Sequence, residues 1–178
     1  MPDADVSTLQ DSKFTLNRQS KIGFPPPETV PSLEARLADD DAQKQLRTLG
    51  FNVVPPDEAD YLAKANTMPR DTTVVADPGG PSFGTAVGGG SRGMFTGIGV
   101  GIPLGPPETD VIHRTELDVT IETVQSPKLT VWQGKIVADR DDAAKYHGPF
   151  FRALLSRIGT TYDGTIRLDK EDEVAPQP

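Results

Sequence analysis

A chain of 178 residues is long enough for one ordinary domain with tails. Only 35% of its residues are hydrophobic, and 17 Gly and 17 Pro predict that much of the chain is loop. The net charge of −8, without a cluster of Lys and Arg, argues against nucleic acid and anionic lipid as partners. The absence of Cys excludes disulfides, thiol catalysis and zinc sites built on Cys.

The N-terminal segment, residues 1–11, is polar, and we expect it to be disordered. No apolar stretch reaches the roughly 18 residues that a membrane-spanning helix needs, so none is expected. The first residues also lack the basic start and apolar stretch of a signal peptide. Two alternatives follow: a cytosolic protein, or one whose leader, with a possible lipid anchor, lies upstream of Met1.

The next segment predicts a strand and then an extended connector. In residues 13–18, Phe14 alternates with polar neighbours, which favours a first strand. Three prolines at 25–27 cannot be helical and indicate an extended connection.

A helix is expected over residues 32–49. Ser32 is a suitable N-cap, and Gly50 stands where a left-handed C-terminal cap is expected. Three aspartates at 39–41 have poor helix propensity, which predicts a kink or a later start. The apolar stripe of this helix consists of Ala35, Ala38, Ala42, Leu46 and Leu49.

A strand over residues 61–68 and a long Gly-rich insertion follow. Tyr61, Ala63 and Ala65 share one face of the strand. Between residues 71 and 108 the glycines are so frequent that we expect a mobile loop, because few side chains offset its ordering entropy. Within it, the alternation of residues 98–104 is also compatible with an extended strand, a cover for a sheet edge, or a contact with a partner.

The most informative stretch is a pair of strands at 115–123 and 129–139. Leu117, Val119 and Ile121 alternate with polar residues, the period of two that a half-buried antiparallel strand requires. Residues 125–128 interrupt the pattern, so the two strands predict a hairpin. Trp132 is expected in the core rather than as a ligand platform, on one face with Thr130 and Ile136, and Gly134 predicts a bulge or a close backbone approach.

A C-terminal helix is predicted over residues 141–158. Gly148 and Pro149 are expected to split it, with the main helix starting at Pro149. A turn at 162–164 and a short edge strand at 165–168 precede a polar tail, residues 169–178. The apolar stripe of this helix consists of Ala144, His147, Phe151, Leu154 and Ile158.

None of the candidate site motifs predicts a catalytic residue, a cofactor site or a metal site. The run from Gly88 to Gly93 matches G-x-G-x-x-G, but the residues after it lack the helical pattern that a dinucleotide site needs. His113 and His147 have no partner at metal-ligand spacing, and no nucleophile elbow is present. Glu116, Asp118 and Glu122 are expected on the outer face of a strand as a solvated acidic surface.

These elements predict an α+β fold. The expected architecture has two layers: an antiparallel or mixed sheet of four to five strands with two helices on one face. Residues 12–168 form the single domain, and residues 71–108 are its Gly-rich insertion.

The order of these parts resembles the domain of unknown function 4136 family of bacterial envelope proteins, which are often lipoproteins. The resemblance covers residues 12–158 and rests on segments 46–51, 59–62, 116–121 and 129–134, with Trp132-Gln133-Gly134 in the last. The chain departs from the family pattern at Gln133, where an arginine is usual, and it has no lipid-bearing cysteine. The resemblance implies a periplasmic or outer-membrane location and no known enzymatic activity.

We therefore expect a non-catalytic cell-envelope protein that acts by binding or assembly with an unidentified envelope partner. A small-molecule or peptide binder that uses a sheet edge or the Gly-rich segment as a lid is the alternative. A hydrolase with an unrecognised site is the third possibility.

Overall fold

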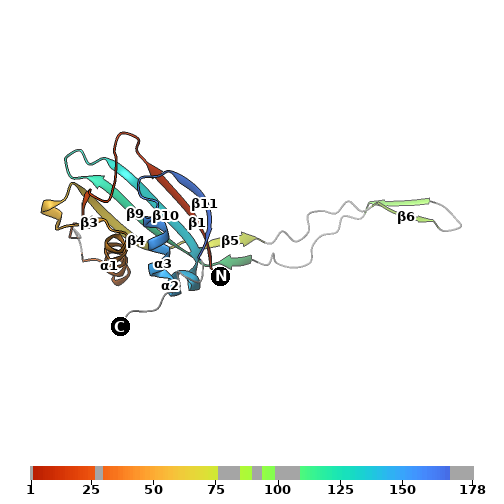
Figure 1. Ribbon diagram of the computed structural model, residues 1–178. Helices are drawn as coiled ribbons and strands as arrows, with labels where there is room; N and C mark the ends of the chain where they lie inside the picture. The colour runs from red at the N-terminus through yellow and green to blue at the C-terminus, as the bar shows by residue number, and fades with distance from the viewer. Residues whose placement is uncertain (1, 27–29, 76–84, 90–93, 99–108, 169–178) are drawn as a thin grey trace. The chain divides into compact units, whose positions relative to one another are not determined.

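The computed structural model describes residues 2–26, 30–75, 85–89, 94–98 and 109–168 (Figure 1). The chain divides into two units. The first consists of Met1–Asp71 and His113–Pro178, and the second is Thr72–Ile112.

The first unit is built on one seven-stranded sheet in the order β11-β1-β10-β9-β4-β2-β3. β2 runs parallel to both β3 and β4, and the other neighbours are antiparallel. The sheet is therefore mixed, and larger than the sequence predicted. Its strands are β1 (Asp3–Gln10), β2 (Lys21–Gly23), β3 (Asn52–Val53), β4 (Tyr61–Pro69), β9 (Arg114–Thr123), β10 (Thr130–Asp139) and β11 (Tyr162–Arg167).

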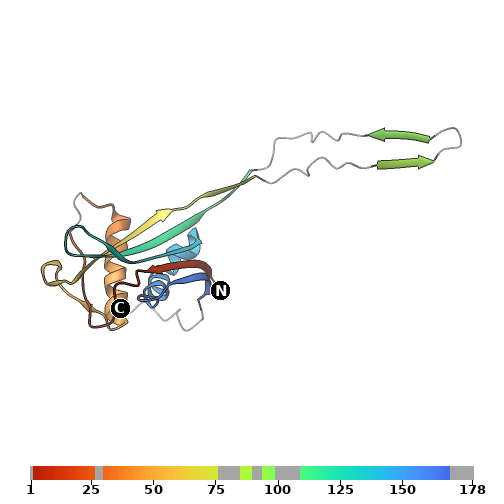
Figure 2. The ribbon, with the colours of Figure 1, turned by 90° about the horizontal axis from the view of Figure 1, so that it is seen from above.

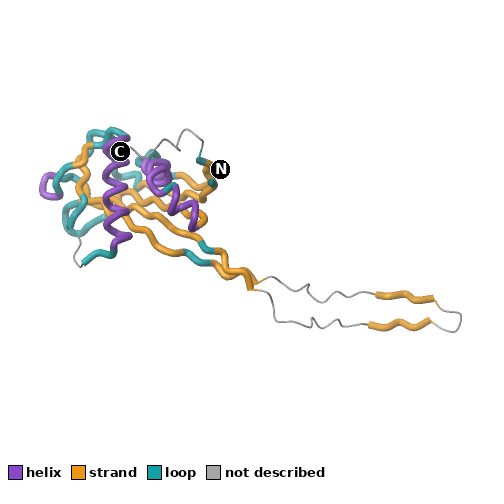
Figure 3. The backbone as a smooth tube through the Cα atoms, turned by 90° about the horizontal axis from the view of Figure 1, so that it is seen from below, coloured by secondary structure: helices purple, strands orange, loops and turns teal. Residues whose placement is uncertain are grey.

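In the described part of this unit, three α-helices and one short 3₁₀-helix accompany the sheet. They are α1 (Leu33–Thr48), α2 (Arg140–Lys145), α3 (His147–Leu155) and η1 (Pro56–Glu58). α1 and α3 pack against each other; α1 also contacts β4, and α3 contacts β10 (Figures 2 and 3). The α+β class and the two-layer arrangement are confirmed.

The core lies between the helices and one face of the sheet. Leu117, Val119 and Ile121 of β9 are fully buried, as their alternation predicted. α3 contributes Phe150 and Phe151, and the small residues Ala38 and Ala42 let α1 approach closely. The burial of this apolar layer is the main force that holds the two layers together.

The predicted hairpin is present as β9 and β10. The register shifts between Thr130 and Trp132, so a bulge at Val131 breaks the strict alternation. Val131 and Trp132 are consequently both buried, whereas Thr130 is exposed; the prediction that Thr130 shares the face of Trp132 was wrong. Trp132 is fully buried in the core, as predicted.

Helix α1 begins and ends as predicted. The Ser32 hydroxyl accepts a hydrogen bond from the Ala35 amide, and Gly50 has a φ of 84°. The predicted kink or later start is absent because the three aspartates do not interrupt the helix. Two of them, Asp39 and Asp41, accept hydrogen bonds from other elements.

The N-terminal segment is ordered, and the prediction that it is disordered was wrong. Residues expected to be disordered form β1, which pairs with β10 on one side and β11 on the other. Ala4, Val6 and Thr8 point into the core, but their small side chains leave little hydrophobic signal in the sequence. The strand expected at 13–18 is loop instead.

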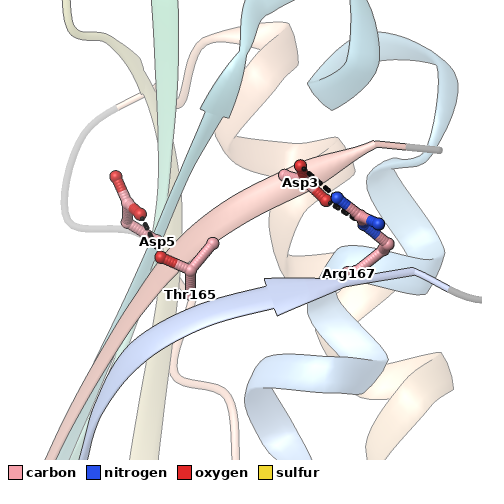
Figure 4. A network of polar contacts seen from close by, with 4 residues as sticks. All are labelled: Asp3, Asp5, Thr165 and Arg167. Carbon is pink, nitrogen blue, oxygen red and sulfur yellow. Dashed lines mark hydrogen bonds and ion pairs between the residues drawn. The ribbon is translucent and has the colours of Figure 1, made fainter.

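Charged side chains link β1 to β11 on the outer face of the sheet (Figure 4). Arg167 donates from Nε to Asp3 Oδ1 at 2.8 Å and from an Nη atom to Asp3 Oδ2 at 3.2 Å. Thr165 Oγ1 donates to Asp5 Oδ1 at 3.0 Å. The edge strand is thus tied to its neighbour by side chains as well as by the backbone ladder.

The C-terminal elements differ in their boundaries from the prediction. The helical region divides at Tyr146 rather than at Gly148, and α3 starts at His147. Because α2 and α3 are separate helices, the predicted apolar stripe does not continue from one to the other. Ala144, expected on that stripe, is exposed, and Ala143 is buried instead. The turn expected at 162–164 is part of β11.

The second unit contains strands in the segment that the sequence predicted to be a mobile loop. β5 (Thr72–Val75) pairs with β8 (Thr109–Ile112), and β6 (Thr85–Gly89) pairs with β7 (Met94–Ile98), both antiparallel. Backbone pairing supplies hydrogen bonds that composition does not reveal. Residues 76–84, 90–93 and 99–108, which include most of the alternating run and the expected lid, lie outside the described residues.

Candidate functional site

The glycine motif lies on a strand pair rather than at a helix start. Gly88 and Gly89 belong to β6, and Met94 begins β7; residues 90–93 lie outside the described part. A dinucleotide site needs a helix whose N-terminus faces the pyrophosphate. Because a strand follows the motif, the match does not define such a site.

The acidic residues of β9 are less solvated than the sequence analysis expected. Glu116 is buried, with 8% of its surface exposed, and Arg70 Nη1 lies 3.4 Å from its Oε2, an ion pair without hydrogen-bond geometry. Asp118 and Glu122 are half-buried. On the face of a sheet, long side chains cover shorter neighbours. Alternation alone therefore does not predict which side chains are exposed.

Burial raises the pKa of Asp118 above its ordinary value. A hydrogen bond from Asn66 Nδ2 to Asp118 Oδ1, at 3.2 Å, acts in the opposite direction, and the charge of Glu116 raises the pKa further. Glu116, Asp118 and Asn66 therefore form a partly desolvated patch on the outer face.

The two histidines occupy different surroundings. His113 is exposed, and its Nδ1 lies 3.2 Å from Asp71 Oδ1, which is also half exposed. His147 is 22% exposed and contacts two polar side chains at once. The structure therefore brings one histidine, and not the other, into a polar network at the edge of the core.

The His147 network joins three elements. His147 Nδ1 lies 2.5 Å from Asp41 Oδ2, and its Nε2 lies 3.1 Å from Thr67 Oγ1. Asp41 comes from the middle of α1, Thr67 from β4, and His147 starts α3. We call these three residues the Asp41–His147–Thr67 relay. A hydroxyl, an imidazole and a carboxylate in this order are the parts of an activated nucleophile.

Packing fixes the imidazole of the relay. The Phe151 ring meets the His147 ring edge-on, with 4.9 Å between centroids. The relay could not be predicted from the sequence because Asp41 lies 106 positions from His147, and Thr67 lies 80 positions from it. No local spacing carries that signal. The only hint was a histidine on an otherwise apolar helical stripe.

An open groove lies at the end of the sheet where β9 turns into β10. Its volume is about 860 Å³. Apolar side chains supply part of its wall, including Phe14, Tyr61, Val124 and Leu129, of which the last two are 40% and 50% exposed. The other lining residues are Asn17, Gln19, Ser20, Ala59, Asp60, Thr123, Gln125, Ser126 and Pro127.

The walls of this groove are held by local hydrogen bonds. Asn17 Oδ1 accepts from the amides of Gln19 and Ser20, and Thr123 Oγ1 accepts from the Leu129 amide. Each of these bonds lies within one of the two loops that line the groove. The groove is therefore lined by two loops that each carry their own hydrogen bonds.

Two further findings concern metal ligands and membrane-spanning helices. Among the residues that the structure describes, no three His, Cys, Asp or Glu side chains are grouped so as to hold a metal ion. Within the same part of the chain, no helix has both the length and the apolar character to cross a membrane.

Comparisons with known proteins add a fold likeness. No family model matches the chain, and no curated protein matches it either. A crystal structure of a PDZ domain protein from Parabacteroides distasonis ATCC 8503 is similar, with a TM-score of 0.54 and 9% sequence identity. The match covers 92% of this chain and 37% of that one, so the chain spans little more than a third of that protein's length. At this identity the likeness concerns the fold alone.

Proposed function

We propose that this protein is a non-catalytic binding protein that holds a segment of a partner protein in the groove beside the β9–β10 turn. The observation that carries the proposal is the lining of the groove. It combines two aromatic rings, exposed aliphatic side chains and several amides and hydroxyls. Such a mixture of apolar walls and a few fixed polar groups is typical of binding sites.

Charge narrows the class of partner. Of the residues that line the groove, Asp60 alone carries a formal charge, and the whole chain has a net charge of −8. A strongly acidic segment would be repelled, whereas a neutral or basic one would be favoured. We therefore infer a neutral or basic segment that bears apolar side chains.

Two weaker considerations support a binding role. The similar structure is that of a PDZ domain protein, and PDZ domains bind peptides. The resemblance to the domain of unknown function 4136 family supports a partner in the cell envelope. Fractionation of cells that express the gene with its native upstream sequence would test that location.

The groove is tested by selecting random peptides on the immobilised protein. We expect neutral or basic sequences with apolar side chains to be enriched. The substitutions Val124→Asp and Leu129→Asp should weaken binding of the selected peptides at least tenfold, because they place charge in the groove. Leu9→Asp, at a site that is 65% exposed and not part of the groove, is the matched control. Equal loss in all three variants, or no enrichment, would contradict the proposal.

A further inference from the structure

We propose that the Asp41–His147–Thr67 relay makes the Thr67 hydroxyl a nucleophile that accepts an acyl group from an activated ester or thioester. This inference does not depend on the groove. It concerns a covalent modification site, with one acyl group per protein, rather than an enzyme that turns over.

The relay has the geometry that this chemistry requires. A carboxylate at Asp41 holds the Nδ1–H of His147, with 2.5 Å between Oδ2 and Nδ1. In the neutral tautomer that carries its proton on Nδ1, Nε2 accepts the hydroxyl hydrogen of Thr67, whose Oγ1 lies 3.1 Å away. The imidazole is thus oriented by one partner and directed as a base at the other.

The other histidine shows that this arrangement is specific. His113 also has Nδ1 beside a carboxylate, that of Asp71, at 3.2 Å. Within the described residues, however, no hydroxyl is hydrogen-bonded to the Nε2 of His113. The His113–Asp71 pair is therefore a natural control for an imidazole–carboxylate contact without a nucleophile.

The site is open enough for a reagent and has a favourable dipole. Thr67 is half-buried, and the Asp41 side chain is 37% exposed. α3 begins at His147, so the positive end of its dipole lies beside the relay. Negative charge that develops on an attacked carbonyl oxygen would be favoured there.

The proposed step balances without any further reactant. Thr67 Oγ1 attacks the carbonyl carbon of the acyl donor while its proton moves to His147 Nε2. Asp41 stabilises the imidazolium that forms. The bond from the carbonyl carbon to the alcohol or thiol then breaks, and the leaving group takes the proton from His147. Thr67 is left as an ester, and the relay returns to its starting charge.

The test uses p-nitrophenyl acetate as the acyl donor and mass spectrometry of the digested full chain as the readout. We expect acetyl-Thr67 in the native protein. Thr67→Ser should retain the modification, and Thr67→Val should abolish it. Because a positioned base contributes about 10²–10⁴-fold, His147→Gln should slow modification of residue 67 about a hundredfold. Asp41→Asn should slow it as well, and His113→Gln should not.

A structural role for the relay would give a different result. A purely structural relay would affect the melting temperature of His147→Gln but would not determine the rate at which an ester forms on Thr67. If thermal unfolding shows that Thr67→Ser and Asp41→Asn are folded, their labelling remains informative. Acetylation confined to lysines and the N-terminus, or equal rates at Thr67 in the native protein and in Asp41→Asn, would overturn the proposal.

Discussion

Asp39 of α1 reaches the edge of β4, where its Oδ1 accepts a hydrogen bond from the backbone amide of Ala65 at 3.0 Å. β2 pairs with β4 only at Tyr61 and Leu62. The Asp39 carboxylate therefore accepts a hydrogen bond from β4 beyond the point where β2 ends. A side chain thereby satisfies a main-chain donor on the side of β4 away from β9. Helix and sheet are coupled at this point by one bond.

Replacement of Asp39 by asparagine should stabilise the protein at neutral pH. Burial raises the pKa of Asp39, although the bond from Ala65 acts in the opposite direction. The pKa of Asp39 in the folded protein lies above the ordinary 3.8. The contribution of this carboxyl to the free energy of unfolding is therefore full below pH 3.8 and is lost as the pH rises through the folded-state pKa. Asparagine keeps the acceptor and removes the cost of a desolvated charge.

Chemical denaturation at about pH 7 and about pH 3 measures this effect. Asp39→Asn should exceed the native protein in unfolding free energy at the higher pH and match it at the lower. Asp39→Ala leaves the Ala65 amide without its acceptor and should be less stable than Asp39→Asn by about 1–3 kcal/mol. If the native protein had a higher free energy of unfolding than Asp39→Asn at neutral pH, the charge of Asp39 would be favourable in the folded protein.

The charge of Glu116 should be visible in the titration of Asp118. Burial and, to a lesser extent, the charge of Glu116 raise the pKa of Asp118. Glu116→Gln should therefore lower the pKa of Asp118 while leaving it above 3.8, because burial persists. NMR titration of the Asp118 carboxyl measures the shift. Glu122→Gln is the control, since that residue lies about 13 Å further along the strand; an equal shift would exclude a local effect of Glu116.

The parts of the fold that could be predicted are those specified by nearby residues. The hairpin followed from the alternation around Val119, and α1 followed from Ser32 and Gly50 at its ends. In both, the period or the cap lies within a few residues of the feature that it determines. The α+β class followed from the same local patterns.

The parts that were missed depend on distant residues. β1 is a strand because β10 and β11 lie on either side of it, and its own side chains indicate little. The relay likewise depends on the packing of α1 and α3 against the sheet, which brings Asp41 to His147. The contact of Arg70 with the buried Glu116 is another feature that alternation cannot supply.

Gly134 on β10 should not tolerate a side chain. A Cβ at this position would lie 2.5 Å from Cη2 of Trp132 and 2.9 Å from Cδ1 of Leu154. Gly134→Ala should therefore destabilise the protein by about 1–3 kcal/mol, because the buried indole has no room to move away. Gly148→Ala is the control, since its nearest neighbour is the flexible end of Gln45 at 3.3 Å. Thermal unfolding of both variants measures the difference, and equal stability would mean that the Trp132 ring can shift.

The pairing of Arg167 with Asp3 should be visible in a titration. The hydrogen bond from Arg167 lowers the pKa of Asp3 below its ordinary 3.8. For a lowered carboxyl pKa, the contribution to stability is present above the ordinary value and is lost as pH falls through the folded pKa. Arg167→Gln should raise the pKa of Asp3 towards 3.8 in an NMR titration.

The effect on global stability should be small, because both side chains of this pair are largely exposed. Thr165→Val removes the donor to Asp5 on the same pair of strands and leaves Arg167 in place, so it is the matched control. The pKa of Asp3 should not change in that variant. An Asp3 pKa that stays low in Arg167→Gln would mean that the guanidinium is not its cause.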